Sequence, residues 1–393
     1  MNKKLLFSQL LFLTVVVGAC TSEDTTPIPT KTTNASGIST PLTESKTTDW
    51  NAIAKMTTES EIQNFWHSSK YYFKTTPGFT DEWQGYWPQA HGLELMLDAY
   101  MRDSTDYQAD VIDKWHNGVK TKNGGTFRND YFDDMAWNAI ATLRTYEMTG
   151  DVRYKTAALQ LWTWLLGGWS DNICGGGISW STGSLNFKNA PATNPTGIFA
   201  ARMYREFGDP KYLDLANKCY NWVKATLFVP SSGFVNDGIR SVNGQNVLDR
   251  GDYIYNQGTF IGMALELYYI TGDKTYLDDA INAADYAVSN KTSGAGILGG
   301  TDNGDGGLFN GIFIRYFTQL ILCKDIDTIS RNTYLYILEK NAISAWSKGC
   351  SKDLLFSGDW TKLPSGTIFG NPNIQACTLL EAAALLQREG NIK

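Results

Sequence analysis

At three places in the chain a Gly-Asp pair stands between two predicted helical segments, and this repeat limits the architecture that the sequence can adopt. The copies lie at Gly150-Asp151, Gly208-Asp209 and Gly272-Asp273, so their Asp residues are 58 and 64 positions apart. Glycine takes up the left-handed conformation that ends many helices, and aspartate caps the start of the next helix. Each copy therefore predicts a tight turn between two helices, within a repeated unit of two helices and a loop.

Apolar residues recur at helical spacing along twelve segments, which make about six helical hairpins. The segment 254–271 is apolar around nearly its whole circumference and suits an inner helix, whereas 210–226 is apolar mostly on one side. We therefore predict an all-α fold, the (α/α)6 toroid, with an open superhelix of stacked hairpins as the alternative. The predicted helices are 50–73, 88–102, 105–122, 132–149, 152–168, 192–207, 210–226, 254–271, 274–290, 308–323, 326–348 and 372–389.

The predicted connections differ in length according to the helix that they lead to. Turns at the three Gly-Asp motifs are short, whereas the segments that lead into the inner helices are long: 74–87, 169–191, 227–253, 291–307 and 349–371. In a ring of hairpins all of these long segments fall at the end where the inner helices begin. Long loops gathered at one end of a fold commonly build a site, so we expect the site there.

The first 48 residues carry signals for export and attachment. Residues 1–19 predict a lipoprotein signal peptide, because two lysines and a short apolar run lead to Gly18-Ala19 and then Cys20. A lipid on Cys20 would anchor the protein to a membrane of the bacterial cell envelope, with the outer membrane favoured and its orientation open; an ordinary secretory signal is the alternative. Residues 20–48 are rich in Ser, Thr and Pro and predict a flexible tether. One (α/α)6 domain at 49–393 follows, and we expect it to be a monomer.

Composition argues against two classes of partner. The chain has 34 Lys and Arg against 40 Asp and Glu, a net charge of −6 and no basic run, so nucleic acid is not expected as a partner. The histidines His67, His91 and His116 stand apart, and neither a metal site nor a cofactor is predicted. Beyond Cys20 the five cysteines are irregularly spaced, which favours mostly buried free thiols over a disulfide framework.

Two consecutive carboxylates, Asp133 and Asp134, open an inner helix at the end where the long loops gather. Carboxyl groups held close together cannot both ionise freely, so one keeps its proton while the other is charged. Cleavage of a glycosidic bond requires this division of labour. Helix capping is the alternative, because aspartate is favoured in the first turn, and the position at the loop-rich end favours catalysis.

The spacing of the two carboxylates also bears on stereochemistry. A retaining glycosidase holds its two carboxyl groups about 5–5.5 Å apart, and an inverting enzyme holds them about 6.5–9.5 Å apart. Neighbouring helix positions differ by about 100° around the axis, which favours the shorter separation. We therefore expect retention, with a covalent glycosyl-enzyme intermediate.

Aromatic residues make up 13% of the chain, and many fall in the long loops or at the starts of inner helices. Flat apolar rings flanked by amides suit sugar rings, and for the loop aromatics core packing is an equal alternative. Asn256 could instead be a helix cap. Arg315 lies on an inner helix, where an unpaired charge is costly, so we expect it to pair with a site carboxylate or to bind sugar hydroxyls. The candidate sugar contacts are Trp83, Trp87, Trp137, Tyr255, Asn256, Gln257 and Arg315.

Five blocks of sequence stand out along the chain: Phe132–Trp137, Cys174–Trp180, Lys188–Ala190, Tyr255–Gly258 and Gly306–Tyr316. In content and order they resemble glycoside hydrolase family 76, the bacterial and fungal α-1,6-mannanases. The resemblance implies an (α/α)6 fold and endo-acting, retaining cleavage of α-1,6-mannan backbones without a metal. It also implies Asp133 as the nucleophile and Asp134 as the acid/base, and it adds Trp180, Asn189 and Phe309 to the sugar contacts.

The resulting prediction is a lipid-anchored endo-1,6-α-mannosidase, a hydrolase acting on α-mannan polysaccharide or oligosaccharide. A non-catalytic glycan-binding surface lipoprotein is one alternative, because it would use the same aromatic residues. Another (α/α)6 glycosidase with a different substrate, such as a uronic acid, is the second. Recognition of uronic acids favours a basic site, whereas basic residues near the blocks are few, chiefly Arg128, Lys188 and Arg315.

Overall fold

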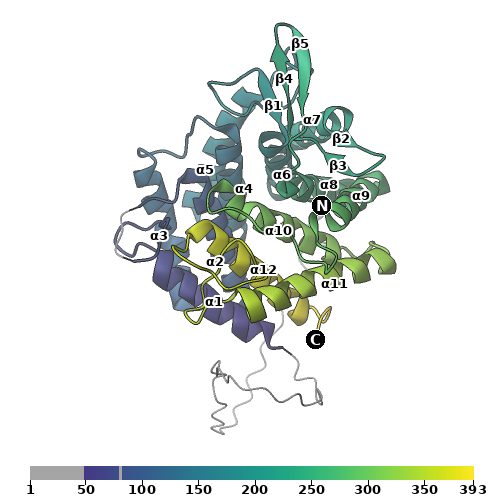
Figure 1. The fold of residues 1–393 in the computed structure, drawn as a ribbon. Coiled ribbons are helices and arrows are strands. Elements are labelled where there is room, and N and C mark those ends of the chain that lie inside the picture. The colour runs from purple at the N-terminus through teal and green to yellow at the C-terminus, as the bar shows by residue number, and fades with distance from the viewer. Residues whose placement is uncertain (1–47, 79–81) are drawn as a thin grey trace, which may run out of the picture. The chain divides into compact units, whose positions relative to one another are not determined.

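The computed structural model describes residues 48–78 and 82–393 (Figure 1). The predicted signal peptide at 1–19, the lipid site Cys20 and all but the last residue of the predicted tether at 20–48 lie outside the described residues. Of the helices in the described part of the chain, none is long and apolar enough to cross a membrane.

Six inner helices form a closed ring in which each packs against the next and the last packs against the first. Six outer helices pack on the outside of this ring. Because α12 meets α2, the ring closes, so the predicted (α/α)6 toroid is confirmed and the open superhelix is wrong. The inner helices are α2 (Tyr86–Arg102), α4 (Phe132–Thr149), α6 (Ala190–Phe207), α8 (Ile254–Thr271), α10 (Phe309–Leu322) and α12 (Gly370–Arg388). The outer helices are α1 (Trp50–Phe65), α3 (Asp106–Lys122), α5 (Val152–Leu165), α7 (Pro210–Thr226), α9 (Lys274–Lys291) and α11 (Thr328–Ser344).

The three Gly-Asp turns behave as their sequence predicts. Gly150, Gly208 and Gly272 end α4, α6 and α8 in the left-handed conformation, with φ of 71°, 73° and 73°. The aspartate that follows each glycine accepts a hydrogen bond from a first-turn N–H of the next helix. These tight turns lie at one end of the ring, which leaves the long connections for the other end.

Three helices end at least three residues before their predicted bounds: α1, α5 and α11. Helix α11 ends at Ser344 rather than at 348, and the π-helix Ala345–Gly349 follows it. Helix α1 ends at Phe65 rather than at 73, because the chain turns back and Trp66 pairs with Phe73 in an antiparallel bridge. Tyr71, inside this turn, has a φ of 64°, which is incompatible with a continued right-handed helix. Helix α5 ends at Leu165 and is followed by the short 3₁₀ turn Leu166–Gly168.

Among the described residues, five short strands lie in the long loops, where the sequence predicted none. β1 (Phe187–Asn189), β4 (Gly238–Val242) and β5 (Gln245–Asp249) form an antiparallel sheet in the order β1-β4-β5, with Asn189 opposite Gly238. β2 (Phe228–Val229) and β3 (Phe234–Val235) form a separate pair. The N–H of Ala190 donates to the Asp237 carbonyl at 2.7 Å. The sheet therefore ties the loop before α8 to the start of α6.

Buried ion pairs join the inner helices toward the end of the ring where these helices stop. Arg315 of α10 lies 2.8 Å from both Glu94 and Asp98 of α2, and Arg144 of α4 lies 2.5 Å from Asp98. A cavity of about 180 Å³ lies there, lined by these four side chains and by Glu381 of α12 among others. These pairs connect α2 to α4 and to α10. They stabilise the closed ring only as long as each buried charge keeps its partner.

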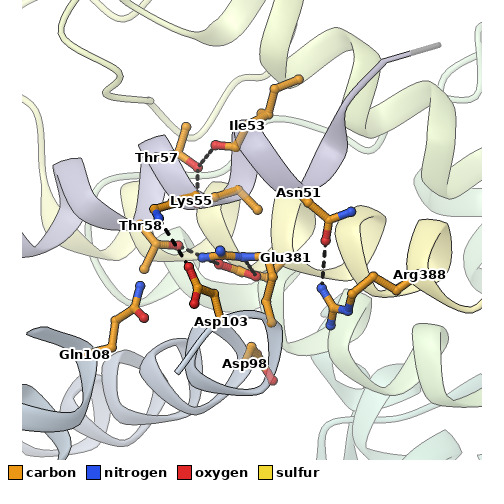
Figure 2. Close-up of polar contacts among 12 residues, drawn as sticks. Asn51, Ile53, Lys55, Thr57, Thr58, Asp98, Asp103, Gln108, Glu381 and Arg388 are labelled. Atoms are coloured by element: carbon orange, nitrogen blue, oxygen red, sulfur yellow. Dashed lines mark hydrogen bonds and ion pairs between the residues drawn. The ribbon is translucent and has the colours of Figure 1, made fainter. Parts of the chain in front are cut away.

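Glu381 connects α12 to the first two helices of the chain (Figure 2). Its carboxylate accepts hydrogen bonds from the guanidinium of Arg102 at 2.9 and 3.0 Å and from the hydroxyl of Thr58 at 2.9 Å. Nearby, Lys55 and Asp103 form a more exposed ion pair at 3.2 Å. The C-terminal helix is thus held to α1 and α2 by a buried charge pair. Elsewhere in the core, Cys219, Cys323 and Cys377 are buried free thiols, as predicted.

Candidate active site

Asp133 and Asp134 occupy the second and third positions of α4, at the end of the ring where the long loops gather. Both side chains are half-buried. One oxygen of Asp133, Oδ1, accepts the backbone N–H of Asp134 at 3.0 Å, and the other, Oδ2, accepts the indole N–H of Trp180 at 3.1 Å. Within the described residues the carboxyl group of Asp134 receives no such donor. The two neighbouring acids therefore sit in different surroundings.

These surroundings give the two carboxyl groups different protonation states. Burial raises the pKa of Asp133 to about 7, while the two donors oppose this rise and Asp237 adds to it. Burial also raises the pKa of Asp134 well above its ordinary value, and the charges of Asp133 and Asp305 raise it further. Hydrogen bonds to a carboxylate favour its charged form, so the negative charge belongs on Asp133 and the proton on Asp134.

Helix capping accounts for only half of the pair. Asp133 does accept a free N–H of the first turn, as a capping residue would. Asp134 makes no contact of this kind, and the residue at the cap position is Tyr131, whose side chain does not cap the helix. A buried carboxyl group without a local structural partner is a candidate for chemistry.

A third carboxylate, Asp237, lies close to the pair and was not predicted. Its Oδ1 accepts the Tyr255 hydroxyl at 3.2 Å and the Asn256 side-chain amide at 3.0 Å. Burial raises its pKa, and these two donors oppose the rise. Asp237 stands in a long loop outside the motif blocks, and its partners follow 18 and 19 residues later, so no local pattern marked it.

A fourth carboxylate, Asp305, precedes α10 and is held by a hydrogen bond from α2. It begins the 3₁₀ turn Asp305–Leu308 before α10 and accepts the indole N–H of Trp87 at 3.0 Å. The Trp87 ring meets the edge of His91 at 5.3 Å, and His91 lies 5.1 Å from Trp137. Trp87 and His91 belong to the first turns of α2, and Trp137 belongs to α4. The Trp137 side chain is buried in the core.

Exposed aromatic side chains flank the carboxylates on two sides. Tyr131 is 41% exposed and Trp180 is 37% exposed, and their rings lie 5.1 Å apart. Tyr253, also exposed, stacks on Tyr255 at 5.7 Å, and Phe309 lies 4.2 Å from Tyr255. Tyr131 and Tyr253 were not predicted, although each directly precedes the first residue of an inner helix.

Three amide side chains that were predicted to contact sugar make hydrogen bonds within the protein. Asn189, which is 2% exposed, caps α6 by accepting the N–H of Ala192 at 3.3 Å. Asn256 and Gln257 have no exposed surface; Asn256 holds Asp237, and the Gln257 amide bridges main-chain groups of two segments. Asn256 is not the helix cap either, because α8 begins at Ile254. These three amides therefore have structural partners, and direct sugar contact stays a prediction for each of them.

Two further predicted contacts lie away from the acid pair. Arg315 pairs with Glu94 and Asp98 and lines the cavity toward the far end of the ring, so the expected pairing with a site carboxylate is wrong. It lies nearly two turns into α10, past the end where the loops gather. Trp83 is half-buried, with its ring against Tyr72 at 5.2 Å and its backbone paired with Lys74.

The described part of the chain contains no cluster of side chains suited to bind a metal ion. No group of three or more His, Cys, Asp or Glu side chains within it is arranged to hold a metal ion. The described acids instead bind to indole, hydroxyl, amide and guanidinium groups.

Comparison with known proteins decides the family. Residues 50–391 match the model of glycosyl hydrolase family 76. The chain belongs to this family. The structure of the family 76 α-1,6-mannanase GH76A from Salegentibacter sp. HEL1_6 superimposes with a TM-score of 0.83 at 37% sequence identity. That comparison covers 86% of this chain and 100% of the other.

Two other family 76 comparisons bear on the site and on the breadth of the relationship. A variant of the Salegentibacter mannanase in which two consecutive aspartates are asparagine is described as inactive, and its structure contains α-1,6-mannotriose. Mannan endo-1,6-alpha-mannosidase DCW1 of Saccharomyces cerevisiae is 24% identical over 73% of this chain. The chain spans about two thirds of the length of such curated relatives, 68% for DCW1 and 64% for one from Schizosaccharomyces pombe.

Proposed function

We propose that this family 76 protein is an endo-acting, retaining α-1,6-mannanase that uses Asp133 as nucleophile and Asp134 as acid/base. The observation that carries the proposal is the asymmetry of the pair: both oxygens of Asp133 accept hydrogen bonds, while Asp134 is half-buried next to two negative charges. A charged carboxylate beside a protonated one is the arrangement that glycoside cleavage requires.

The inactive Salegentibacter variant supports the choice of residues. Consecutive aspartates occur at two places in this chain, Asp133-Asp134 and Asp278-Asp279. The second pair lies on the outer helix α9, where Asp279 accepts the Tyr220 hydroxyl and pairs with Lys224. The pair on the inner helix α4 is therefore the one in a position to meet a glycan.

In the first step an oxygen of Asp133 attacks C1 of the mannosyl unit. The bond between C1 and the glycosidic oxygen breaks, and the proton of Asp134 passes to that oxygen, which leaves as the 6-hydroxyl of the next mannose. Asp133 keeps lone pairs free for this attack, because each carboxylate oxygen accepts only one of the hydrogen bonds described above. The product is an ester between mannose and Asp133, with Asp134 now charged.

In the second step a water molecule attacks the same C1 from the side that the leaving mannose has vacated. Asp134 accepts the proton of this water, the bond between C1 and Asp133 breaks, and both acids return to their starting states. Two displacements restore the original α configuration. The exposed rings of Tyr131, Trp180 and Tyr253 and the half-buried ring of Phe309 are suited to pack on the C–H faces of mannose units on either side of the acids.

Asparagine variants of the two acids test the assignment. We expect Asp133→Asn and Asp134→Asn each to lower the release of reducing ends from unbranched α-1,6-mannan by about 10³-fold or more, while both variants still bind mannotriose. Asp278→Asn, on an exposed position of the other pair, is the control and should keep wild-type activity. Full activity in both active-site variants would exclude the mechanism, and an inactive wild type that binds mannan would indicate a glycan-binding lipoprotein.

The stereochemistry of the product tests retention separately. Proton NMR of a fresh digest reports the anomer released before mutarotation mixes the two forms. We expect the α anomer first. Release of the β anomer first would show a single displacement by water and would remove the nucleophilic role of Asp133.

We also propose that the enzyme is held at the bacterial envelope through a lipid on Cys20. Support comes from the sequence: the export signal ends at Cys20, and a Ser/Thr/Pro-rich tether separates it from the domain. Metabolic labelling with a radioactive fatty acid should mark the wild type and not a Cys20→Ser variant. Protease treatment of intact cells then reports orientation, because a surface-facing domain is digested and a periplasmic one is protected.

A further inference from the structure

Trp180 is the described side chain that donates a hydrogen bond directly to the proposed nucleophile. Its indole N–H lies 3.1 Å from Oδ2 of Asp133, on the oxygen that the backbone of Asp134 does not reach. The sequence resemblance implied a sugar contact for Trp180, and a ring that is 37% exposed allows one. The hydrogen bond gives the same residue a second, separable task.

The backbone around Trp180 is fixed directly to the backbone beside Asp133. The carbonyl of Trp180 accepts the N–H of Phe132 at 2.8 Å, and the N–H of Thr182 donates to the carbonyl of Asp130 at 2.8 Å. Between these two bonds Ser181 pairs with Tyr131 in an antiparallel bridge. On its other side the N–H of Trp180 donates to the carbonyl of Phe187 at 2.9 Å. The indole therefore has a set position relative to Asp133.

We propose that Trp180 is a positioning residue for the reaction: its indole N–H holds Asp133 in the charged form and in one orientation for attack. This inference rests on the proposed function, because it assigns the means by which one acid of the pair becomes the nucleophile. A neutral donor fits this task, since it stabilises the carboxylate without adding a positive charge that would weaken attack.

Other charged and titratable groups act on the same pair and set what remains without the indole. Asp133 faces Asp134 on its own helix, Asp237 from the β3–β4 segment and the Tyr255 hydroxyl from α8. Asp305 faces Asp134. These acids all disfavour charge on Asp133 or Asp134. With the indole removed, the backbone N–H groups of Asp134 and of Asp133 itself remain as hydrogen-bond donors to the Asp133 carboxylate among the described residues.

Trp180→Phe is the informative variant, because it keeps an aromatic face and removes the donor. Trp169→Phe is the matched control: it removes an indole that donates at 2.8 Å to Asp171, a different aspartate. For Trp180→Phe we expect the acidic limb of the kcat/KM profile to move up by about one pH unit. At pH values below this limb, kcat of Trp180→Phe should be about tenfold lower than that of the wild type, while KM should differ by less than about twofold. The control should leave the profile unchanged.

Carbon-13 NMR titration of labelled aspartate side chains provides a readout that does not need activity. The Asp133 signal, assigned by its loss in Asp133→Asn, should titrate about one unit higher in Trp180→Phe than in the wild type. An unchanged titration in a folded Trp180→Phe protein would overturn the inference, as would a defect confined to KM. An inactive wild type with the shifted titration would refute the proposed function and show only that the Trp180 indole stabilises the charged form of Asp133.

Discussion

The indole N–H of Trp87 donates to Oδ1 of Asp305 at 3.0 Å and joins the start of α2 to the turn that precedes α10. This contact spans 218 residues of sequence and fixes an acid whose charge raises the pKa of Asp134. In the proposed mechanism this charge helps Asp134 to keep the proton that the leaving group needs. The surroundings of the pair thus come from separate parts of the chain, because Trp180 precedes α6 and Asp305 precedes α10.

Wild-type activity should follow a bell-shaped pH profile displaced from that of ordinary carboxylic acids. The active form has Asp133 charged and Asp134 protonated, so activity rises as Asp133 loses its proton and falls as Asp134 loses its own. Because the pKa of Asp133 is raised to about 7, the acidic limb of kcat/KM should lie near pH 7 rather than near pH 4. A profile already flat at pH 5 would contradict the raised pKa.

Asp305→Asn should move the basic limb of the same profile to lower pH. The substitution removes a negative charge that raises the pKa of Asp134, so Asp134 loses its proton more readily. The new side-chain oxygen can still accept the Trp87 indole, so the loop should stay in place. Asp171→Asn is the control, since Asp171 also accepts an indole N–H and does not act on the pair. A basic limb that moves upward would show that Asp305 acts in another way.

Gly208→Ala should lower the free energy of unfolding by about 1 kcal/mol. The methyl group meets no neighbouring atom, so the cost comes from the φ of 73°, which an L side chain rarely adopts. Gly167→Ala serves as the control, because its position is equally open and its φ is not in the left-handed region. Urea unfolding of the two variants measures the difference, and equal stabilities would mean that the turn tolerates the strain.

Arg315→Leu should destabilise the protein by about 3 kcal/mol and leave KM for mannan near the wild-type value. Removing one partner of a buried ion pair leaves Glu94 and Asp98 with less compensation, although Arg144 still contacts both. Lys55→Ala, at a more exposed pair with Asp103, should cost under about 0.5 kcal/mol. A stable Arg315→Leu protein with a greatly raised KM would instead support the predicted role of Arg315 in sugar binding.

The parts of the fold that could be predicted from the sequence are those with local causes. Gly208-Asp209 defines a turn through the backbone of two adjacent residues, so a single chain position carries the signal. The all-round apolar pattern of 254–271 likewise identifies an inner helix that is buried from Ile254 to Tyr268. The strands were missed because β1 and β4 are three and five residues long and find each other across about 50 positions.

In the site, too, features with a local cause could be predicted and features that depend on distant residues could not. Asp133 and Asp134 were found because they are adjacent and begin an inner helix, whereas Asp237 was missed because only folding brings it to Tyr255 and Asn256. Arg315 was misplaced because sequence gives the helix but not how far along it the side chain lies from the loops. Asn256 was assigned to sugar by residue type, and its lack of exposed surface becomes visible only in the structure.

The most direct test of the central claim is to trap the covalent intermediate and locate it. An Asp134→Ala variant, given an α-mannoside with a leaving group that needs no protonation, should still form the ester and should break it down slowly. Peptide mass spectrometry of the quenched protein is then expected to find one mannosyl group on Asp133. A mannosyl group on any other residue would contradict the assignment of Asp133 as the nucleophile.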